Sequence, residues 1–176
     1  MLKYTGYIRK IRYYSESSHY IVALLEVEED QELLTMNGYM SNFNDYDKYA
    51  FYGDFEIHPK YGQQFKLDHY EIVLSTDEEE IIKYLSSPLF KGIGPTQAKY
   101  IVDALGENAL SLIKEDKHHL DLVKGMTVAK RELIYEVLTS NDYDQEVTQF
   151  FMGHGISLRH IGIIQETYKE KTLEIF

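Results

Sequence analysis

The hydrophobic period of the chain changes once, near residue 76, and this change limits the folds that the chain can adopt. Up to about Ser75, apolar residues recur at every second position, as in strands with one buried face. Beyond that point the spacing becomes that of amphipathic helices. The sequence therefore predicts an α+β chain with a β domain over residues 1–76 and an all-helical domain over residues 77–176.

The β part predicts a small barrel. Its period-two runs are Tyr4–Tyr14, Ile21–Val27, Leu33–Met40, Phe51–Ile57 and Phe65–Leu74. In the fourth run Phe51, Gly53, Phe55 and Ile57 share a face, and in the last run the phase changes near Asp68-His69, which indicates a β-bulge. Five short strands favour a closed, OB-like barrel. An open sheet and an SH3-like barrel have the same pattern.

The second part predicts a series of short helices. The first has Ser75 or Thr76 as its N-cap and an acidic first turn that suits the helix dipole. The expected helices span 77–86, 95–105, 107–115, 118–123, 127–139, 144–153, 157–168 and 170–176.

Between the first two expected helices, Gly92-Ile93-Gly94-Pro95 predicts a tight turn followed at once by a new helix. Glycine adopts positive φ without steric cost, and proline suits the first helical turn. The N–H groups at that helix start have no intrahelical partner and carry the positive end of the dipole, so they can hold a phosphate without reading sequence. This is the helix-hairpin-helix signature, and it makes nucleic acid the expected partner.

The signature is repeated. Phe90–Gly94 and Val123–Thr127 both read hydrophobe, Lys, Gly, hydrophobe, small residue, and each is followed by an Ala-Lys pair, Ala98-Lys99 or Ala129-Lys130, which we expect to match between the two copies. His154–His160 is a weaker third copy. The expected DNA-backbone-binding residues are Gly92, Ile93, Gly94, Thr96, Lys99, Gly125, Met126, Thr127, Lys130, Arg131, Gly155, Ser157 and Arg159. The alternative is that these glycines only turn a helical bundle.

The net charge of −11 restricts how such a chain can bind DNA. Residues 1–76 carry 7 Lys and Arg against 12 Asp and Glu, and residues 77–176 carry 11 against 17. Because phosphate neutralisation supplies most non-specific affinity, binding must be local, through backbone amides and a few placed cations. The charge also favours a rival interpretation, a protein–protein docking module with purely structural hairpins.

Composition excludes several other classes. The chain has no cysteine, so disulfides, iron–sulfur clusters and Cys-ligated zinc are absent. No apolar run exceeds the five residues from Ile21 to Leu25, and the start lacks a secretory signal, so we expect a cytoplasmic protein without a membrane span. Adjacent His118-His119, and His154 and His160 six residues apart, are poorly spaced as metal ligands, and no metal is expected.

Two further groups of residues have a possible functional role beside a purely structural one. Asp116 and Asp121 follow the first hairpin at about the distance of the catalytic Asp in hairpin-containing DNA glycosylases, a weak match because a β domain precedes the hairpin here. In the turn His58–Gly62, Lys60 can touch phosphate and Tyr61 can stack on a base. A plain hairpin corner set by the proline and glycine of that turn is favoured. Stacking candidates without a firm choice are Tyr4, Tyr7, Tyr13, Tyr14, Tyr20, Tyr46, Tyr49 and Tyr52.

Two long strings, Gly53–Phe65 and Ile82–Gly94, resemble the N-terminal region of long-form RecD-like DNA helicases, also described as exodeoxyribonuclease V alpha subunits. The resemblance continues through both hairpins to Gly155–Ser157. It implies an ATP-dependent helicase of DNA recombination and repair that moves 5′ to 3′ on single-stranded DNA. It also implies a small barrel and tandem hairpins ahead of the motor, where they hold DNA as an accessory element.

The sequence departs from that family in lacking the motor. It contains no Gly-x-x-x-x-Gly-Lys-Ser/Thr phosphate loop, so the ATP and Mg²⁺ that the resemblance implies cannot be assigned to any residue here, and no catalytic site is expected. The apolar end Leu173–Phe176 suggests that the chain is part of a longer polypeptide. The expected partners are therefore DNA and the motor domains of the same polypeptide.

Overall fold

The computed structural model describes residues 1–140, which form two units, Met1–Val73 and the residues from Leu74 onward. Each unit is described by itself. The helices expected over 144–153, 157–168 and 170–176 lie outside the described residues, as do the third repeat and its candidates Gly155, Ser157 and Arg159.

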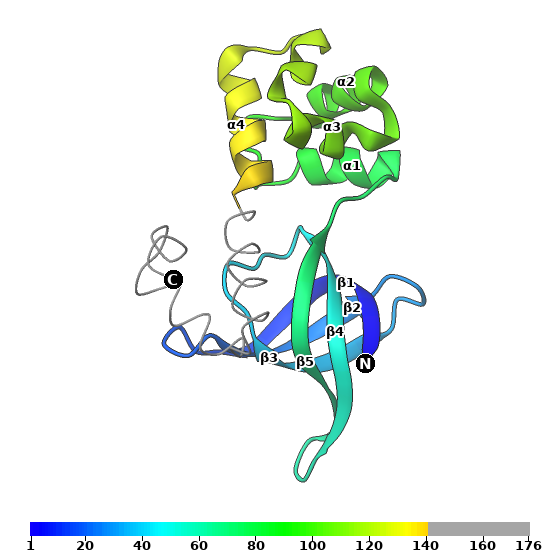
Figure 1. Ribbon diagram of the computed structural model, residues 1–176, viewed down its shortest axis with the longest axis vertical. Coiled ribbons are helices and arrows are strands. Elements are labelled where there is room, and N and C mark those ends of the chain that lie inside the picture. The colour runs from blue at the N-terminus through cyan, green and yellow to red at the C-terminus, as the bar shows by residue number, and fades with distance from the viewer. Residues whose placement is uncertain (141–176) are drawn as a thin grey trace. The chain divides into compact units, whose positions relative to one another are not determined.

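The first unit is a closed five-stranded barrel (Figure 1). Its strands follow the order β1-β2-β3-β5-β4, and β4 closes the barrel against β1. All neighbours are antiparallel except β3 and β5, which run parallel. The strands span Leu2–Tyr14 (β1), Tyr20–Val27 (β2), Leu33–Tyr39 (β3), Lys48–His58 (β4) and Gly62–Val73 (β5). The five predicted strands are therefore confirmed, and the open-sheet alternative is wrong.

The barrel core follows the period-two pattern of the sequence. On β2, Ile21, Ala23 and Leu25 are each at most 1% exposed, while the residues between them are half-buried on the outer face. Two large rings, Phe51 and Phe65, are fully buried beside them. Burying side chains of this size supplies most of the favourable free energy of folding.

The predicted bulge is confirmed at Asp68. Tyr52 pairs with His69 and Gly53 pairs with Leu67, so Asp68 has no partner on β4. The extra residue shifts the phase of β5 by one position. Phe65 and Leu67 therefore face the core before the bulge, and Tyr70 and Ile72 pack against it afterwards.

The face that these β4 residues were expected to share is covered by the barrel core only as far as Phe55. Phe51 is buried and Phe55 packs against the barrel core, but Ile57 is 84% exposed. The reason is that β4 and β5 continue past the strands beside them, since β1 pairs with β4 only as far as Gly53. This stretch forms a hairpin that projects from the barrel (Figure 1).

The second unit is helical. Four α-helices span Glu78–Leu85 (α1), Pro95–Leu105 (α2), Ala109–Glu115 (α3) and Val128–Thr139 (α4). Two 3₁₀ helices, Gly106–Asn108 (η1) and Lys117–Leu122 (η2), link them. The segments predicted at 107–115 and 118–123 are thus helical, but they contain 3₁₀ turns.

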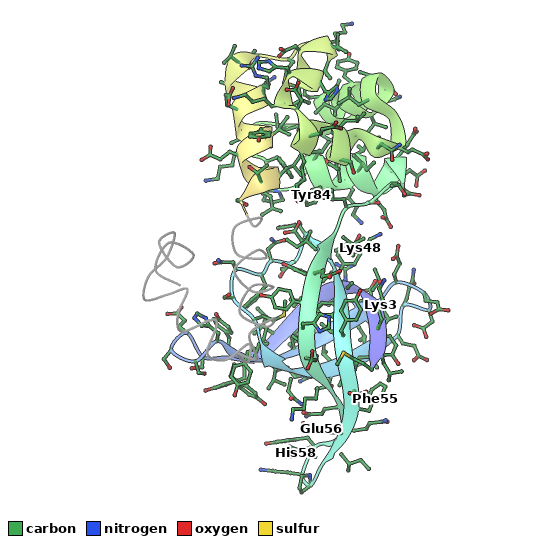
Figure 2. All side chains as sticks on the ribbon, in the orientation of Figure 1. Lys3, Lys48, Phe55, Glu56, His58 and Tyr84 are labelled. Atoms are coloured by element: carbon green, nitrogen blue, oxygen red, sulfur yellow. The ribbon has the colours of Figure 1, made fainter. Side chains whose placement is uncertain are left out.

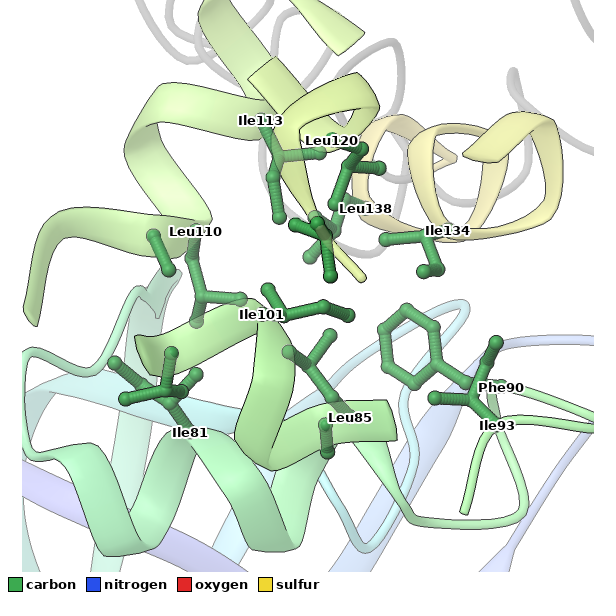
Figure 3. Close-up of a cluster of buried hydrophobic side chains, with 14 residues drawn as sticks. Ile81, Leu85, Phe90, Ile93, Ile101, Leu110, Ile113, Leu120, Ile134 and Leu138 are labelled. Atoms are coloured by element: carbon green, nitrogen blue, oxygen red, sulfur yellow. The ribbon is translucent and has the colours of Figure 1, made fainter. Parts of the chain in front are cut away.

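One apolar cluster holds the helical unit together (Figure 3). Ile81 and Leu85 of α1, Ile101 of α2 and Ile134 of α4 are all fully buried in it. Figure 3 also shows Phe90, from the loop between α1 and α2, pointing into the same cluster. The loop is therefore part of the core.

The N-cap of α1 differs from the expectation. Asp77, not Ser75 or Thr76, has the extended backbone of a cap, and its Oδ1 accepts the N–H of Glu80 at 3.0 Å. The Ser75 hydroxyl supports this arrangement by accepting the N–H of Asp77 at 3.2 Å and donating to Glu80 at 2.6 Å. Asp77 was predicted as part of the acidic first turn, because Asp is favourable both as an N-cap and in the first turn of a helix.

Replacing the cap tests this assignment. We expect Asp77→Ala to lower the free energy of unfolding by about 1 kcal/mol, because one N–H at the start of α1 loses its acceptor. Thr76→Ala is the matched control and should change stability by less than about 0.5 kcal/mol, as for other exposed positions without a specific contact. Urea unfolding followed by far-UV circular dichroism measures both. Equal losses would contradict the cap at Asp77.

A second prediction concerns the close approach of β4 to β5. A Cβ atom on Gly53 would collide with the carbonyl oxygen of Lys66, a backbone atom that cannot turn aside. Gly53→Ala should therefore destabilise the barrel by at least about 2 kcal/mol. Asp54→Ala, at the next and exposed position, should stay within about 0.5 kcal/mol of the parent in the same urea titration.

Candidate nucleic-acid interface

Two β-turns of the same type precede helices α2 and α4. In the first, the N–H of Ile93 donates to the Phe90 carbonyl at 3.2 Å, and Gly92 has φ +84°. In the second, the N–H of Met126 donates to the Val123 carbonyl at 3.2 Å, and Gly125 has φ +77°. Positive φ at the third residue is the mark of a type II turn, and it explains the glycine at that position.

One residue after each turn the chain enters a helix in the same way. Gly94 is the N-cap of α2 with φ −92° and ψ 175°, and Thr127 is the N-cap of α4 with φ −114° and ψ 162°. The carbonyl of each cap accepts the first helical hydrogen bond, from Ala98 at 3.0 Å and from Arg131 at 2.9 Å. Phe90–Gly94 and Val123–Thr127, called here turn 1 and turn 2, therefore share one backbone geometry.

The Ala-Lys pairs after the two turns are not equivalent, which corrects the sequence analysis. Counted from the caps, Ala98-Lys99 occupy the fourth and fifth positions of α2, whereas Ala129-Lys130 occupy the second and third positions of α4. When the two segments are aligned on their turn glycines, α2 contains two more residues before its Ala-Lys pair than α4 does. Lys130 corresponds to Gln97.

Gln97 joins the two turns. Its Nε2 donates to the carbonyl of Lys124, in turn 2, at 3.0 Å, and its Oε1 lies 3.2 Å from the position that a Cβ on Gly125 would take. The two turns therefore lie side by side on one face of the helical unit. Gln97 is not among the residues predicted to bind, because a single contact across 27 residues leaves no periodic signal.

Turn 1 leaves open main-chain donors at the start of α2. No described residue accepts a hydrogen bond from the N–H of Gly94, Thr96 or Gln97. Gly92 and Gly94 are exposed, and no atom lies within 4 Å of a Cβ position on either of them. An anion can therefore approach these donors without displacing protein atoms.

Turn 2 is partly closed by its own cap. Thr127 Oγ1 accepts the N–H of Lys130 at 3.2 Å, so the donor equivalent to the Gln97 N–H is already satisfied. The predicted pair of binding turns is thus unequal in its open donors. The glycine at residue 94, which has no side chain, makes the difference.

The lysines around the two turns and the predicted Arg131 differ in their surroundings. Lys91 and Lys99 are exposed, and within residues 1–140 no carboxylate pairs with either of them or with Lys130. Lys124 lies over the ring of Tyr100, with Nζ 5.3 Å from the ring centroid. These lysines leave positive charge around both turns.

Arg131, by contrast, is held by acidic side chains. Its guanidinium contacts Asp121 at 2.9 Å and Glu132 at 3.1 Å, and the side chain is only 15% exposed. The hydrogen bonds from Arg131 lower the pKa of Asp121, and those from Lys117 and then Arg131 lower the pKa of Glu132. Arg131 therefore fixes α4 to η2 and offers little charge to a ligand.

Ile93 and Met126 shape the turns, and their N–H groups already donate within those turns. Ile93 is 4% exposed in the core of the helical unit, and Met126 packs partly buried against the same core. Their side chains anchor the turns from inside. Thr96 is exposed on the first turn of α2.

The residues considered for other chemistry have structural partners. Asp116 Oδ1 accepts the N–H of His118 at 2.9 Å as the cap of η2, and Asp121 also lies 2.9 Å from His118 Nδ1. The ring of His119 donates to the Leu112 carbonyl at 2.9 Å. Within residues 1–140 no group of three or more His, Asp and Glu is placed to hold a metal ion. Together with the absence of a phosphate loop, these residues do not fit ATP or Mg²⁺, and no nucleotide chemistry is assigned to them.

The candidate tyrosines of the barrel fall into separate groups. Tyr49 is buried in the core, and Tyr52 stacks on His69 with ring centroids 4.4 Å apart. On the outer face, the ring centroid of Tyr20 lies 6.2 Å from that of Tyr13 and 5.4 Å from that of Tyr39. No single row of stacking platforms joins them.

The described part of the chain contains no helix that is both long and apolar enough to cross a bilayer. Residues 1–75 match the family model described as ATP-dependent DNA helicase YrrC, OB-fold domain. The matched residues coincide with the closed barrel and its parallel β3–β5 pair, and they end before α1. The barrel thus agrees with the RecD-like resemblance of the sequence, and residues 1–75 belong to the OB-fold domain family of the RecD-like DNA helicase YrrC.

Proposed function

We propose that turn 1 and turn 2, with the helices they begin, are helix-hairpin-helix motifs that hold the DNA backbone beside the motor domains of a RecD-like helicase. The observation that carries this proposal is the pairing of two turns of similar geometry through Gln97, with open amides at turn 1 and exposed lysines near it in sequence. The match of residues 1–75 to the OB-fold domain of a DNA helicase supports DNA as the ligand.

The binding chemistry begins at turn 1. A phosphate oxygen can accept hydrogen bonds from the open N–H groups of Gly94, Thr96 and Gln97, at the positive end of the α2 dipole. Lys91 and Lys99 supply cations next to it. Contacts of this kind position a DNA backbone but do not read bases, which suits a helicase that must pass over any sequence.

Turn 2 has a supporting role in this proposal. Because Thr127 occupies the Lys130 N–H, turn 2 contributes mainly the side chains of Lys124 and Lys130. The Gln97 bridge fixes the spacing of the two turns before DNA arrives. Preorganised contacts lose less conformational entropy on binding.

The net charge of −11 limits the affinity of the chain for DNA. With few free cations, the grip neutralises few phosphates, so the logarithm of affinity should fall with the logarithm of salt along a slope of about two to four. An accessory contact of this strength can guide DNA at the motor while leaving it free to slide.

The lysine contribution is tested by reversing charge at both turns. We expect Lys99→Glu combined with Lys130→Glu to abolish measurable binding of a short duplex at low salt, because each change replaces a phosphate-facing cation by a repelling carboxylate. Fluorescence anisotropy at several salt concentrations gives both affinity and slope. Lys3→Glu combined with Lys10→Glu, on exposed positions of β1, makes the same change in net charge and should leave most of the binding intact.

Unchanged affinity in a folded Lys99→Glu/Lys130→Glu protein would contradict the DNA grip. The acidic surface and the hairpins would then act as a protein–protein docking module for the motor domains.

The amide contribution is tested by giving turn 1 the cap of turn 2. Residue 94 has an ordinary backbone conformation and open space at Cβ, so Gly94→Thr should fold normally. We expect its hydroxyl to take the Gln97 N–H and to weaken DNA binding about tenfold, the value of one hydrogen bond to a charged group. The free energy of unfolding should change by less than about 0.5 kcal/mol, since Thr and Gly are similar caps.

The mirror variant, Thr127→Gly, serves as the control for Gly94→Thr. It frees the Lys130 N–H and should keep or raise the affinity. A loss of binding in Thr127→Gly as large as that in Gly94→Thr would argue against open amides as the binding groups.

A further inference from the structure

Two exposed apolar side chains border turn 2, one on each side. Leu122, the last residue of η2, is 78% exposed, and Val128, the first residue of α4, is 65% exposed. Within residues 74–140 they are the only large apolar side chains that are mostly exposed. Single exposed apolar residues are ordinary, but apolar residues that gather at one place mark an interaction site.

The backbone of turn 2 brings the two positions toward each other. The N–H of Met126 donates to the Val123 carbonyl at 3.2 Å, which closes the turn and reverses the direction of the chain. Val123 itself is 5% exposed and belongs to the core of the helical unit. Leu122 and Val128 therefore lie on the two sides of one fixed reversal, and this pair is called here the apolar rim.

Turn 1 has no such rim. When the two turns are aligned on their glycines, Leu122 corresponds to Leu89, which packs half-buried against the core of the helical unit. The next residue, Phe90, lies edge-on against the ring of Tyr84 in α1, with ring centroids 5.1 Å apart (Figure 2). The apolar side chains before turn 1 are thus used inside the unit, whereas the apolar rim faces solvent.

The apolar rim lies close to the proposed phosphate site. Gln97 has an open N–H at turn 1, and its Nε2 donates to the carbonyl of Lys124 in turn 2 at 3.0 Å. One glutamine side chain therefore spans the two turns, and Lys124 is two residues from Leu122. Because nucleotides follow one another along a strand at about 3.4 Å, a strand held at both turns has its sugars beside the apolar rim.

The sugar is the part of a strand that suits an apolar contact. Phosphates carry the charge and are held by amides and lysines, whereas the sugar of DNA has only hydrogens at the carbon where RNA carries its 2′-hydroxyl. The side chains of Leu122 and Val128 have no donor or acceptor. A ribose packed on them would lose hydrogen bonds to water without replacement.

We propose that the apolar rim packs against sugars of the bound strand and selects deoxyribose over ribose, so that the grip holds DNA in preference to RNA. This inference rests on the proposed function. It adds a choice that phosphate contacts cannot make, because DNA and RNA have the same phosphates. Leu122 and Val128 are the residues that make this choice.

Single strands of oligo(dU) and oligo(rU) test the proposal, because they differ only at the 2′ position. We expect the full 176-residue chain to bind oligo(dU) about fivefold more tightly at low salt, the effect of leaving one hydroxyl without a partner. Leu122→Asn combined with Val128→Thr keeps the size of both side chains and adds groups that can pair with a hydroxyl. In this rim variant the ratio of the two affinities, measured by fluorescence anisotropy, should fall about threefold or more.

A matched change on the barrel is the control. Leu33→Asn alters a side chain that is 59% exposed and directly follows the acidic segment Glu28–Glu32, where DNA is repelled. It should leave the ratio of affinities unchanged. Val128→Thr alone is a milder variant for the case that the double variant does not fold, and it should lower the ratio in the same direction.

Three results would each overturn the proposal: equal affinity of the parent chain for the two strands, an unchanged ratio in a folded rim variant, or the same change of ratio in Leu33→Asn. The rim and the grip can also fail separately. Loss of DNA binding in Lys99→Glu/Lys130→Glu, with an unchanged ratio in the rim variant, would keep the grip and remove the rim. A lowered ratio in the rim variant, with full binding in Lys99→Glu/Lys130→Glu, would keep the sugar contact and remove the lysine grip.

Discussion

The arrangement of both turns depends on apolar side chains that the turns themselves place in the helical core. Phe90 and Ile93 of turn 1 and Val123 of turn 2 are each at most 5% exposed, in the cluster that packs α1, α2 and α4 together. Gly94, the first residue with an open N–H, directly follows the buried Ile93 and is held in place by it. The binding surface is therefore made of backbone whose position is fixed by hydrophobic burial, and its donors are in place before a ligand arrives.

Much of this fold follows from local sequence, because its elements obey local rules. Alternation on β2 and the phase change on β5 reflect which side chains face the barrel core, so strands and bulge were predictable. The turn glycines were equally predictable, since positive φ restricts the choice of residue. The exposure of Ile57 was not predictable, because alternation shows which residues share a face but does not show where the neighbouring strands end.

The features that local rules miss are contacts between distant residues. Gln97 reaches Lys124, and Arg131 is neutralised by Asp121, which lies ten residues earlier at the end of η2. Neither pairing has a spacing that marks it in a sequence. They matter for the site, since one sets the distance between the turns and the other removes a cation from it. The Ala-Lys correction has the same origin, because only the backbone frame shows which residues of the two helices correspond.

The parallel pairing of β3 with β5 has a consequence for synthesis on the ribosome. The first strand is completed against the fourth, and the third against the fifth, so the barrel cannot close until the chain has been made through Val73. Non-local pairing of this kind folds slowly, and until closure the edges of β1 and β3 are open to wrong partners. The helical unit has mainly short-range contacts and can form as its residues emerge, so the nascent barrel is the stage at which this protein most needs protection from aggregation.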